Sequence, residues 1–213
     1  MFLPRPGEIG RNALLWCLML VAVHQLGGAA VIKAKAWVAP ILIQQAWQQT
    51  LLSGGEAVKP WPWADTWPVA RLRVPALGVE RLVLAGDSGN ALAFGPGHTA
   101  ASAVLGSPGL AVIGGHRDTH FAFLRRIEPG FRIQLELPGG EQRHYRVRFA
   151  RIVDSSAESL SGSGVLERLL LVTCYPFDAL HAGGSLRYVV SAFPEHTVPA
   201  EALVAAGRGV YPL

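Results

Sequence analysis

The chain has 213 residues, which suffices for one well-buried domain with an appendage but excludes two full-sized domains. Half of the residues are apolar and only 16% are charged. This hydrophobic composition indicates a membrane segment. The net charge is +4, yet the arginines are scattered and form no basic stripe with interleaved aromatic residues. We therefore expect no nucleic acid among the partners.

The N-terminal part starts with a tail over residues 1–12 and continues with an apolar run that carries no charged side chain as far as residue 32. A run of this length matches the ~20 residues that cross ~30 Å of hydrocarbon. It exceeds the ~7–15 residues of a signal-peptide core, so we predict a retained transmembrane anchor over residues 13–35. Basic residues flank both ends of the run, and charge alone leaves its orientation open.

Residues 36–68 are predicted to connect this anchor to the domain. Apolar residues at helical spacing, with Trp37 and Trp47, favour a helix over 36–52 that lies at the membrane interface or extends the anchor. A stiff, extended linker follows, held by Pro60, Pro62 and Pro68.

The domain over residues 69–213 shows short β-branched runs punctuated by glycine and proline, which predict a mainly β barrel or sandwich. A hairpin turn is expected at 138–140, a helix at 119–127 and a turn at 91–95. The predicted strands are 70–74, 80–84, 110–114, 132–137, 143–153, 169–173 and 186–192.

Cys174 ends one of these apolar strands and is followed by a proline. A nucleophile at the end of a rigid strand is held in place while its reactive atom faces outward. A lone cysteine is more often a structural residue, so the neighbouring signals decide. The other cysteine, Cys17, lies in the apolar N-terminal run, and we expect Cys174 to be a free thiol.

His116 and Arg187 supply those signals. The strand before His116 ends in Gly114 and Gly115, so the histidine leaves its strand much as Cys174 leaves its own. Two strands that each end in one half of a Cys/His pair give the arrangement that a thiol enzyme needs. Arg187 begins a strand 13 residues after the cysteine, a separation that allows an adjacent antiparallel strand to return its guanidinium towards the thiol.

Weaker candidates for substrate binding lie around these three residues. One of them, Asp118, is equally explained as the cap of the following helix. Thr173 is also an ordinary strand residue, and His98 an ordinary loop residue. The full set of weaker candidates is His98, Asp118, His120, Thr173 and Tyr175.

Together, Leu-Val-Thr173-Cys174, Gly-His116 and Arg187 resemble the catalytic trio of the sortases, and the resemblance covers roughly residues 69–192. The usual TLxTC motif of that family has Leu170 at its first threonine position here. The segments 114–121 and 175–178 look closest to the Gram-negative (class GN) sortases of marine-type bacteria.

The resemblance implies an eight-stranded closed β-barrel with short helices, placed on the periplasmic side of a bacterial inner membrane. It also implies a cysteine transpeptidase that cleaves an LPxTG-like C-terminal sorting signal and passes the acyl group to an amine. Cys174 would form the thioester, His116 would protonate the leaving amine, and Arg187 would stabilise the oxyanion. The expected partners are a target protein with that signal, an amine acceptor and the membrane. No cofactor or metal is implied, although calcium stays open because some sortases use it.

Two other readings compete with this one. An L,D-transpeptidase also uses cysteine and histidine, but it would place a Ser-x-Gly-Cys motif where Leu-Val-Thr precedes Cys174. A non-enzymatic metal-binding or adhesive module could use His98, His116, Asp118 and His120, because His116 and His120 are four residues apart. That module would leave Cys174 and Arg187 unexplained.

Overall fold

The computed structural model describes residues 6–158, 166–179, 181 and 183–195. The chain divides into two compact units, Met1–Ile41 and Leu42–Leu213. Residues 1–5 of the predicted tail, and residues 159–165, 180, 182 and 196–213 of the predicted domain, lie outside the described residues.

The long helix α1 (Pro6–Leu52) forms the described part of the first unit and continues into the second. Among the described residues, no helix is both long enough and apolar enough to cross a membrane. The predicted transmembrane anchor over 13–35 is therefore not supported. Within the predicted anchor, the longest continuous stretch of described side chains covers residues 14–28. This stretch contains the polar residues His24 and Gln25. Several other side chains of the predicted anchor, at 13, 29–32, 34 and 35, lie outside the described ones.

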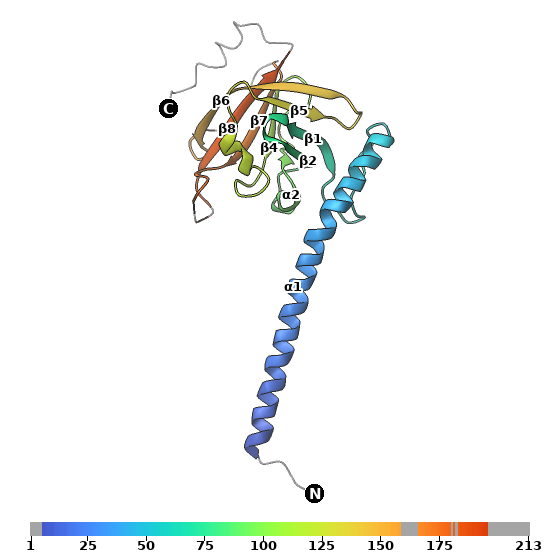
Figure 1. Ribbon diagram of the computed structural model, residues 1–213, viewed down its shortest axis with the longest axis vertical. Helices are drawn as coiled ribbons and strands as arrows, with labels where there is room; N and C mark the ends of the chain where they lie inside the picture. Colours follow the sequence, from blue (N-terminus) through green and yellow to red (C-terminus); the bar gives the residue numbers. More distant parts are fainter. Residues whose placement is uncertain (1–5, 159–165, 180, 182, 196–213) are drawn as a thin grey trace. The chain divides into compact units, whose positions relative to one another are not determined.

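The second unit is a closed barrel of eight strands in the order β1-β2-β3-β4-β7-β8-β6-β5 (Figure 1). This confirms the predicted mainly β closed barrel. The strands are β1 (Pro68–Val74), β2 (Val79–Ala85), β3 (Gly97–His98), β4 (Leu110–Gly114), β5 (Arg132–Glu136), β6 (Gln142–Asp154), β7 (Arg168–Cys174) and β8 (Leu186–Pro194). Short helices connect some of them: η1 (Pro75–Leu77), α2 (Gly89–Phe94) and η2 (Ala122–Arg126).

All seven predicted strands are present, and the hairpin turn joins β5 to β6 as expected. The eighth strand, β3, was missed because its two residues are too few to show an alternating pattern. The helix expected over 119–127 is the shorter 3₁₀ helix η2, whose Phe123 and Leu124 are buried. The turn expected at 91–95 is the helix α2.

Alternating side chains of the strands fill the barrel. In β1, every second residue is buried, and Ala70, Leu72 and Val74 are fully covered. Leu169 and Leu171 of β7 point into the same core. Burial of such aliphatic side chains stabilises a fold by about 1.5–3 kcal/mol each. The core therefore fixes the strand ends that carry the polar residues.

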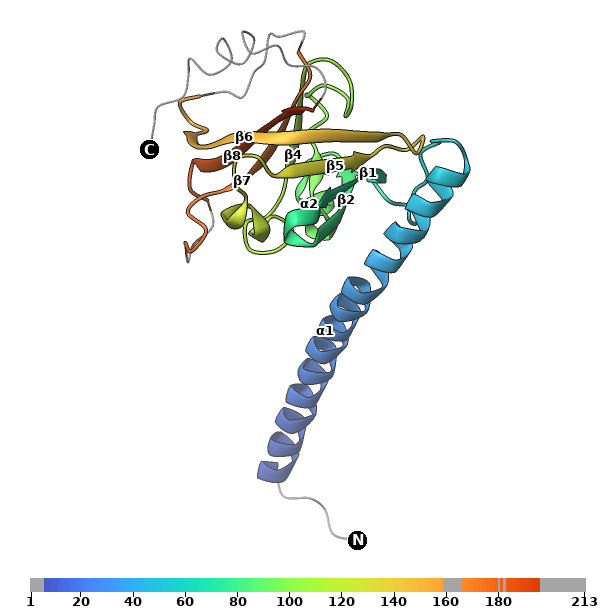
Figure 2. The same ribbon diagram turned by 45° about the horizontal axis from the view of Figure 1, so that its top comes forward.

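The strand pairing around β7 decides where those ends meet. β7 is parallel to β4 on one side and antiparallel to β8 on the other. Consequently the C-terminal ends of β4 and β7 lie at the same edge of the barrel as the start of β8. Figure 2 shows the long strand β6 beside β8, which continues the wall from there.

The C-terminal turns of α1 and the linker belong to the barrel unit. Trp47 is fully buried, and the guanidinium of Arg71 in β1 lies 5.8 Å from its ring centroid. Trp61 of the linker meets Phe94 of α2 edge-on, with ring centroids 5.5 Å apart. The helix predicted up to residue 52 is thus present, and its last turns pack on the barrel.

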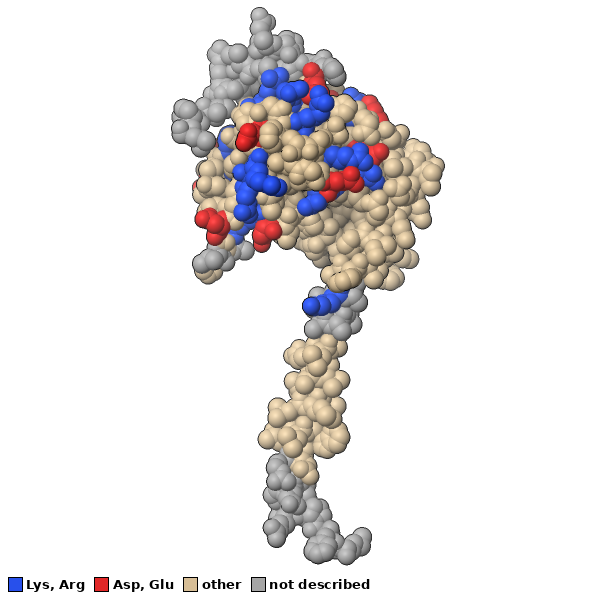
Figure 3. Space-filling model, viewed as in Figure 1, with Lys and Arg blue, Asp and Glu red and all other residues tan. Residues whose placement is uncertain are grey.

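Charged side chains of both signs share the surface of the barrel. On the face drawn in Figure 3, acidic side chains adjoin the basic ones. Arg73 pairs with Glu80 at 2.8 Å, and Arg151 pairs with Glu158 at 2.6 Å. Part of the positive charge is therefore neutralised locally.

Candidate active site

Cys174 is the last residue of β7, and its side chain is half-buried. It is a free cysteine, as predicted. The residue before it, Thr173, is buried, and its Oγ1 donates a 2.7 Å hydrogen bond to the carbonyl oxygen of Gly115. This bond fixes the end of β7 to the segment that follows β4.

His116 lies at the equivalent end of β4. In the parallel pairing Gly114 stands opposite Val172, and the Gly115 N–H donates to the Val172 carbonyl at 3.1 Å. His116 follows Gly115 directly, and Cys174 lies two residues beyond Val172 at the end of β7, so both residues stand at this edge of the barrel. The structure therefore brings together the two strand ends that the sequence indicated, and it leaves the His116 side chain exposed.

A close contact with an aromatic ring shapes the turn that carries His116. The Phe121 N–H donates to the His116 carbonyl at 2.9 Å, and the Phe121 side chain is fully buried. A Cβ atom on Gly115 would lie only 2.8 Å from the Phe121 ring. Glycine is required there because a larger residue would displace the ring or the turn.

Arg187 stands directly opposite Cys174 in the antiparallel pairing of β7 and β8. This confirms the expected return strand. Its Nη1 donates to the carbonyl oxygens of Gly184, at 2.6 Å, and Leu186, at 2.9 Å. The guanidinium is thereby held close to the backbone at the start of its own strand.

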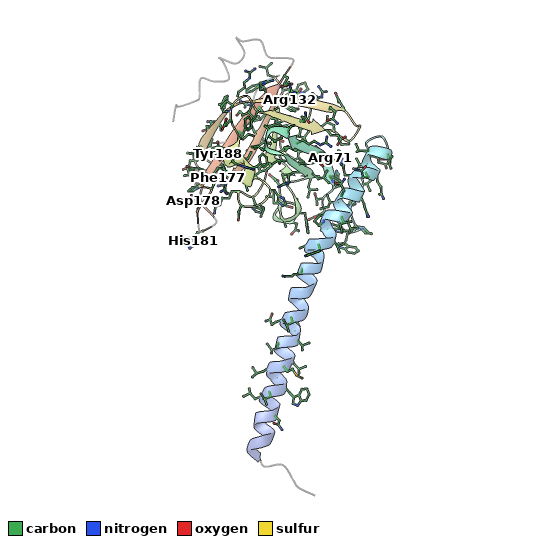
Figure 4. All side chains as sticks on the ribbon, viewed as in Figure 1. Arg71, Arg132, Phe177, Asp178, His181 and Tyr188 are labelled. Carbon is green, nitrogen blue, oxygen red and sulfur yellow. The ribbon has the colours of Figure 1, made fainter. Side chains whose placement is uncertain are left out.

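An aromatic cluster adjoins this edge of the barrel. The rings of Tyr175 and Tyr188 are stacked with centroids 6.3 Å apart, and Phe177 meets Tyr188 at 5.2 Å. The Arg125 guanidinium lies 5.7 Å from the Phe177 ring centroid. Figure 4 shows Phe177 and Tyr188 on the same side of the barrel. Sequence reasoning missed Phe177 and Tyr188, although Tyr188 follows Arg187 and faces Thr173 across the strands.

The comparison with known families decides between the readings. The model of the sortase domain matches residues 72–195, a range that contains the strand ends described above. The chain belongs to the sortase family. This match supports the resemblance to the sortases that the sequence motifs indicated.

Solved sortase structures share the fold. Sortase C1 of pilus island 1 of group B Streptococcus has 22% identity and a TM-score of 0.54 over 62% of this chain and 66% of its own. A lid mutant of sortase A from Corynebacterium diphtheriae has 22% identity and a TM-score of 0.54 over 78% of this chain and 98% of its own. A sortase D5 transpeptidase from Clostridium perfringens has 18% identity and a TM-score of 0.56 over 71% and 92%. This chain thus spans just under two thirds of the first of these relatives. No curated protein matches the sequence.

His120 lies next to the histidine of the trio in this sortase. Burial lowers its pKa, and the positive charges of Arg81 and His116 act in the same direction. The backbone of Ala93 in α2 has the opposite, smaller effect on this pKa. His120 is therefore disfavoured in its charged form at this position.

The other weaker candidates have separate surroundings. The His98 ring lies 2.9 Å from the Ala103 carbonyl oxygen and 3.2 Å from the Ser102 hydroxyl, so it is tied into its own loop. Asp118 is exposed, and it does not cap η2, which begins after Phe121 without a side-chain cap. Thr173 links the two strand ends, and Tyr175 belongs to the aromatic cluster.

Within the described part of the chain, no group of three or more His, Cys, Asp or Glu side chains could hold a metal ion. His98 and His116 lie on different segments, and the His98 ring bonds to Ala103 and Ser102 of its own loop. The metal-module reading thus finds no support among these residues.

Proposed function

We propose that this sortase cleaves an LPxTG-like C-terminal sorting signal through a thioester on Cys174 and transfers the acyl group to an amine. The observation that carries the proposal is the strand arrangement around Cys174. Arg187 stands opposite it on β8, and His116 follows β4, the strand parallel to β7. The alternative L,D-transpeptidase function has no observation in its favour.

In the first half of the proposed reaction, the Cys174 thiolate attacks the scissile carbonyl carbon and forms a C–S bond. The carbonyl electrons move onto oxygen, where the Arg187 guanidinium stabilises the negative charge. When the tetrahedral intermediate collapses, the C–N bond breaks. The His116 imidazolium gives its proton to the departing amine, which leaves a thioester and a neutral imidazole.

In the second half, an incoming amine attacks the thioester carbonyl. Neutral His116 accepts a proton from this amine, a new C–N bond forms, and the C–S bond breaks to release the thiolate. The enzyme returns to its starting protonation state, so no oxidant, reductant or cofactor is consumed. Water in place of the amine would give hydrolysis.

The bonds of Arg187 suit its role. Its Nη1 is held by two backbone carbonyl oxygens, so the side chain loses little further freedom when substrate binds. A guanidinium keeps its charge at any physiological pH and offers several donors in a fixed plane. Loss of one such oxyanion donor typically lowers kcat by ~10²–10³-fold.

The subtype and the location of this sortase are proposals that rest on its sequence. The segments 114–121 and 175–178 carry the likeness to the Gram-negative class GN. The apolar run before residue 33 carries the proposal of a bacterial inner-membrane location with the barrel in the periplasm. Fractionation of producing cells with protease access from the periplasm tests this. A fully soluble cytoplasmic protein would contradict it.

The function is tested by mixing the full chain with a library of LPxTG-like peptides and an amine, and analysing the products by mass spectrometry. We expect a cleaved or amine-ligated product that is absent with the Cys174→Ala variant. A stem-peptide crosslink in a parallel reaction with peptidoglycan fragments would instead favour the L,D-transpeptidase reading. No Cys174-dependent product from any peptide would overturn the proposal.

A further inference from the structure

The side chain of Arg117, directly after His116, reaches across to the loop that follows Cys174. Its Nη1 donates to the Pro176 carbonyl oxygen at 2.9 Å. Its Nη2 donates to the carbonyl oxygens of Ala179, at 2.8 Å, and His181, at 3.1 Å. One guanidinium therefore donates hydrogen bonds to three backbone carbonyl oxygens of the β7–β8 loop.

A second link joins the same two segments on the strand side. The Thr173 hydroxyl donates to the Gly115 carbonyl, and the Gly115 N–H donates to the Val172 carbonyl. His116 thus has a cross-link before it and another after it, and both lead to the segment that carries Cys174. Figure 4 shows His181, the last of the three acceptors, on the same side of the barrel as Phe177 and Tyr188.

We propose that Arg117 is a positioning residue for the His116–Cys174 pair, which rests on the proposed function above. The guanidinium fixes the turn of His116 to the loop after Cys174, while Thr173 fixes the two strand ends. The spacing between imidazole and thiol is then set from both sides. Arg117 acts through these carbonyl contacts and does not itself touch the reacting atoms.

The chemistry of arginine suits this role. Its planar guanidinium presents five N–H donors in a fixed fork, so it can serve three acceptors that lie in different directions. A lysine ammonium at the end of a flexible stem cannot hold the same three carbonyls with comparable geometry. A displacement of about 1 Å at a reacting group can cost ~10²-fold in rate. Loss of the Arg117 hydrogen bonds is therefore expected to lower the rate of the chemical step.

Arg146 offers a matched control. It is also half-buried, and its Nη1 donates to the Gly130 carbonyl at 3.0 Å while its Nη2 pairs with Glu195 at 2.9 Å. It faces Phe193 near the C-terminal end of β8, whereas Cys174 faces Arg187 near its start. Arg146→Ala therefore removes a comparable guanidinium far from the reacting pair.

The test is single-turnover acylation of the full chain by a substrate peptide, followed by intact-protein mass spectrometry. Two quantities are separated: the amplitude, which reports the fraction of correctly folded enzyme, and the rate constant of thioester formation. For Arg117→Ala we expect a rate constant lowered by about 10- to 100-fold at unchanged amplitude and nearly unchanged KM. Arg117→Lys should recover only part of the rate, and Arg146→Ala should match the wild type.

Arg117→Ala with a wild-type rate constant, or with a loss only in amplitude, overturns the positioning role. If Arg117→Ala does not fold by circular dichroism, Arg117→Lys decides, and a wild-type rate constant for that variant overturns the role as well. If Cys174→Ala still forms product, the proposed function fails, whatever Arg117 does.

Discussion

At the residue scale, His120 has a predictable dependence on pH. Its pKa in the folded chain is lowered, first by burial, from the value near 6.5 that it has when unfolded. Its neutral form therefore contributes stability that is fully present above pH ~6.5 and is lost as the pH falls towards the folded pKa.

This sign gives a measurable difference between the wild type and His120→Gln. Urea unfolding at pH 7.5 and at pH 5.5 should show a smaller loss of unfolding free energy on acidification in the variant. Other titrating groups contribute equally to both proteins, so the comparison isolates His120. An equal or larger loss in His120→Gln would show that this histidine is not destabilised in its charged form.

The strand ends near which the proposed trio lies could be predicted from the sequence at this scale, whereas the catalytic roles of the three residues stay predictions. Cys174, His116 and Arg187 each stand at a strand boundary, and strand boundaries are visible as changes in apolar pattern. Arg117 could not be assigned, because its bonds join residues that are about 60 positions apart and leave no periodic signal. The capping role considered for Asp118 is wrong, because η2 begins after Phe121 and has no side-chain cap.

At the scale of elements, the close approach of Gly115 to the Phe121 ring, within the segment that joins β4 to η2, gives a prediction with an internal control. Gly115→Ala would place a Cβ atom 2.8 Å from the buried Phe121 ring, whereas a Cβ on Gly114 meets nothing within 4 Å. We expect Gly115→Ala to lower the unfolding free energy by about 1–3 kcal/mol, the usual cost of overpacking.

Because this turn carries His116, Gly115→Ala should also reduce the rate of peptide cleavage. Gly114→Ala should leave both quantities near wild type. Chemical denaturation and a cleavage assay on the two variants check this. Equal stability and equal activity in both would mean that the ring yields without moving the turn.

The strands themselves were largely predictable because they are short apolar or alternating runs separated by glycine and proline. The two-residue strand β3 could not be predicted, because its pairing with β2 and β4 depends on these neighbours rather than on its own sequence. The close approach of Gly97 to the Gly86 carbonyl, where a Cβ would lie 2.1 Å from that oxygen, becomes visible only once the strands are paired.

At the scale of the whole molecule, the end of α1 is part of the barrel unit. Trp47 is fully buried there, whereas Trp63 in the linker is 82% exposed. Trp47→Ala is expected to lower the unfolding free energy by about 3–5 kcal/mol, the range for large aromatic residues in cores. Trp63→Ala should change it by less than about 0.5 kcal/mol. Denaturation of both variants checks the difference, and similar effects would argue that Trp47 does not belong to the core.

The closed barrel of eight strands was expected only from the family resemblance, and its full strand order was not predicted because that order depends on long-range pairing. The extent of the helix before the barrel was only partly foreseen. Its last turns were expected to continue to residue 52, and they do, but the sequence left open whether they would lie at a membrane or on the domain.

The central claim is that Cys174 forms a thioester under the control of His116 and Arg187. The most direct measurement traps the acyl-enzyme of the full chain with a sorting-signal peptide in the absence of amine and weighs the intact protein. The wild type should gain the mass of the acyl fragment at Cys174. His116→Ala and Arg187→Ala should gain it at least about 100-fold more slowly, and Cys174→Ala should gain none. An adduct on another residue, or equal rates in all variants, would contradict the account.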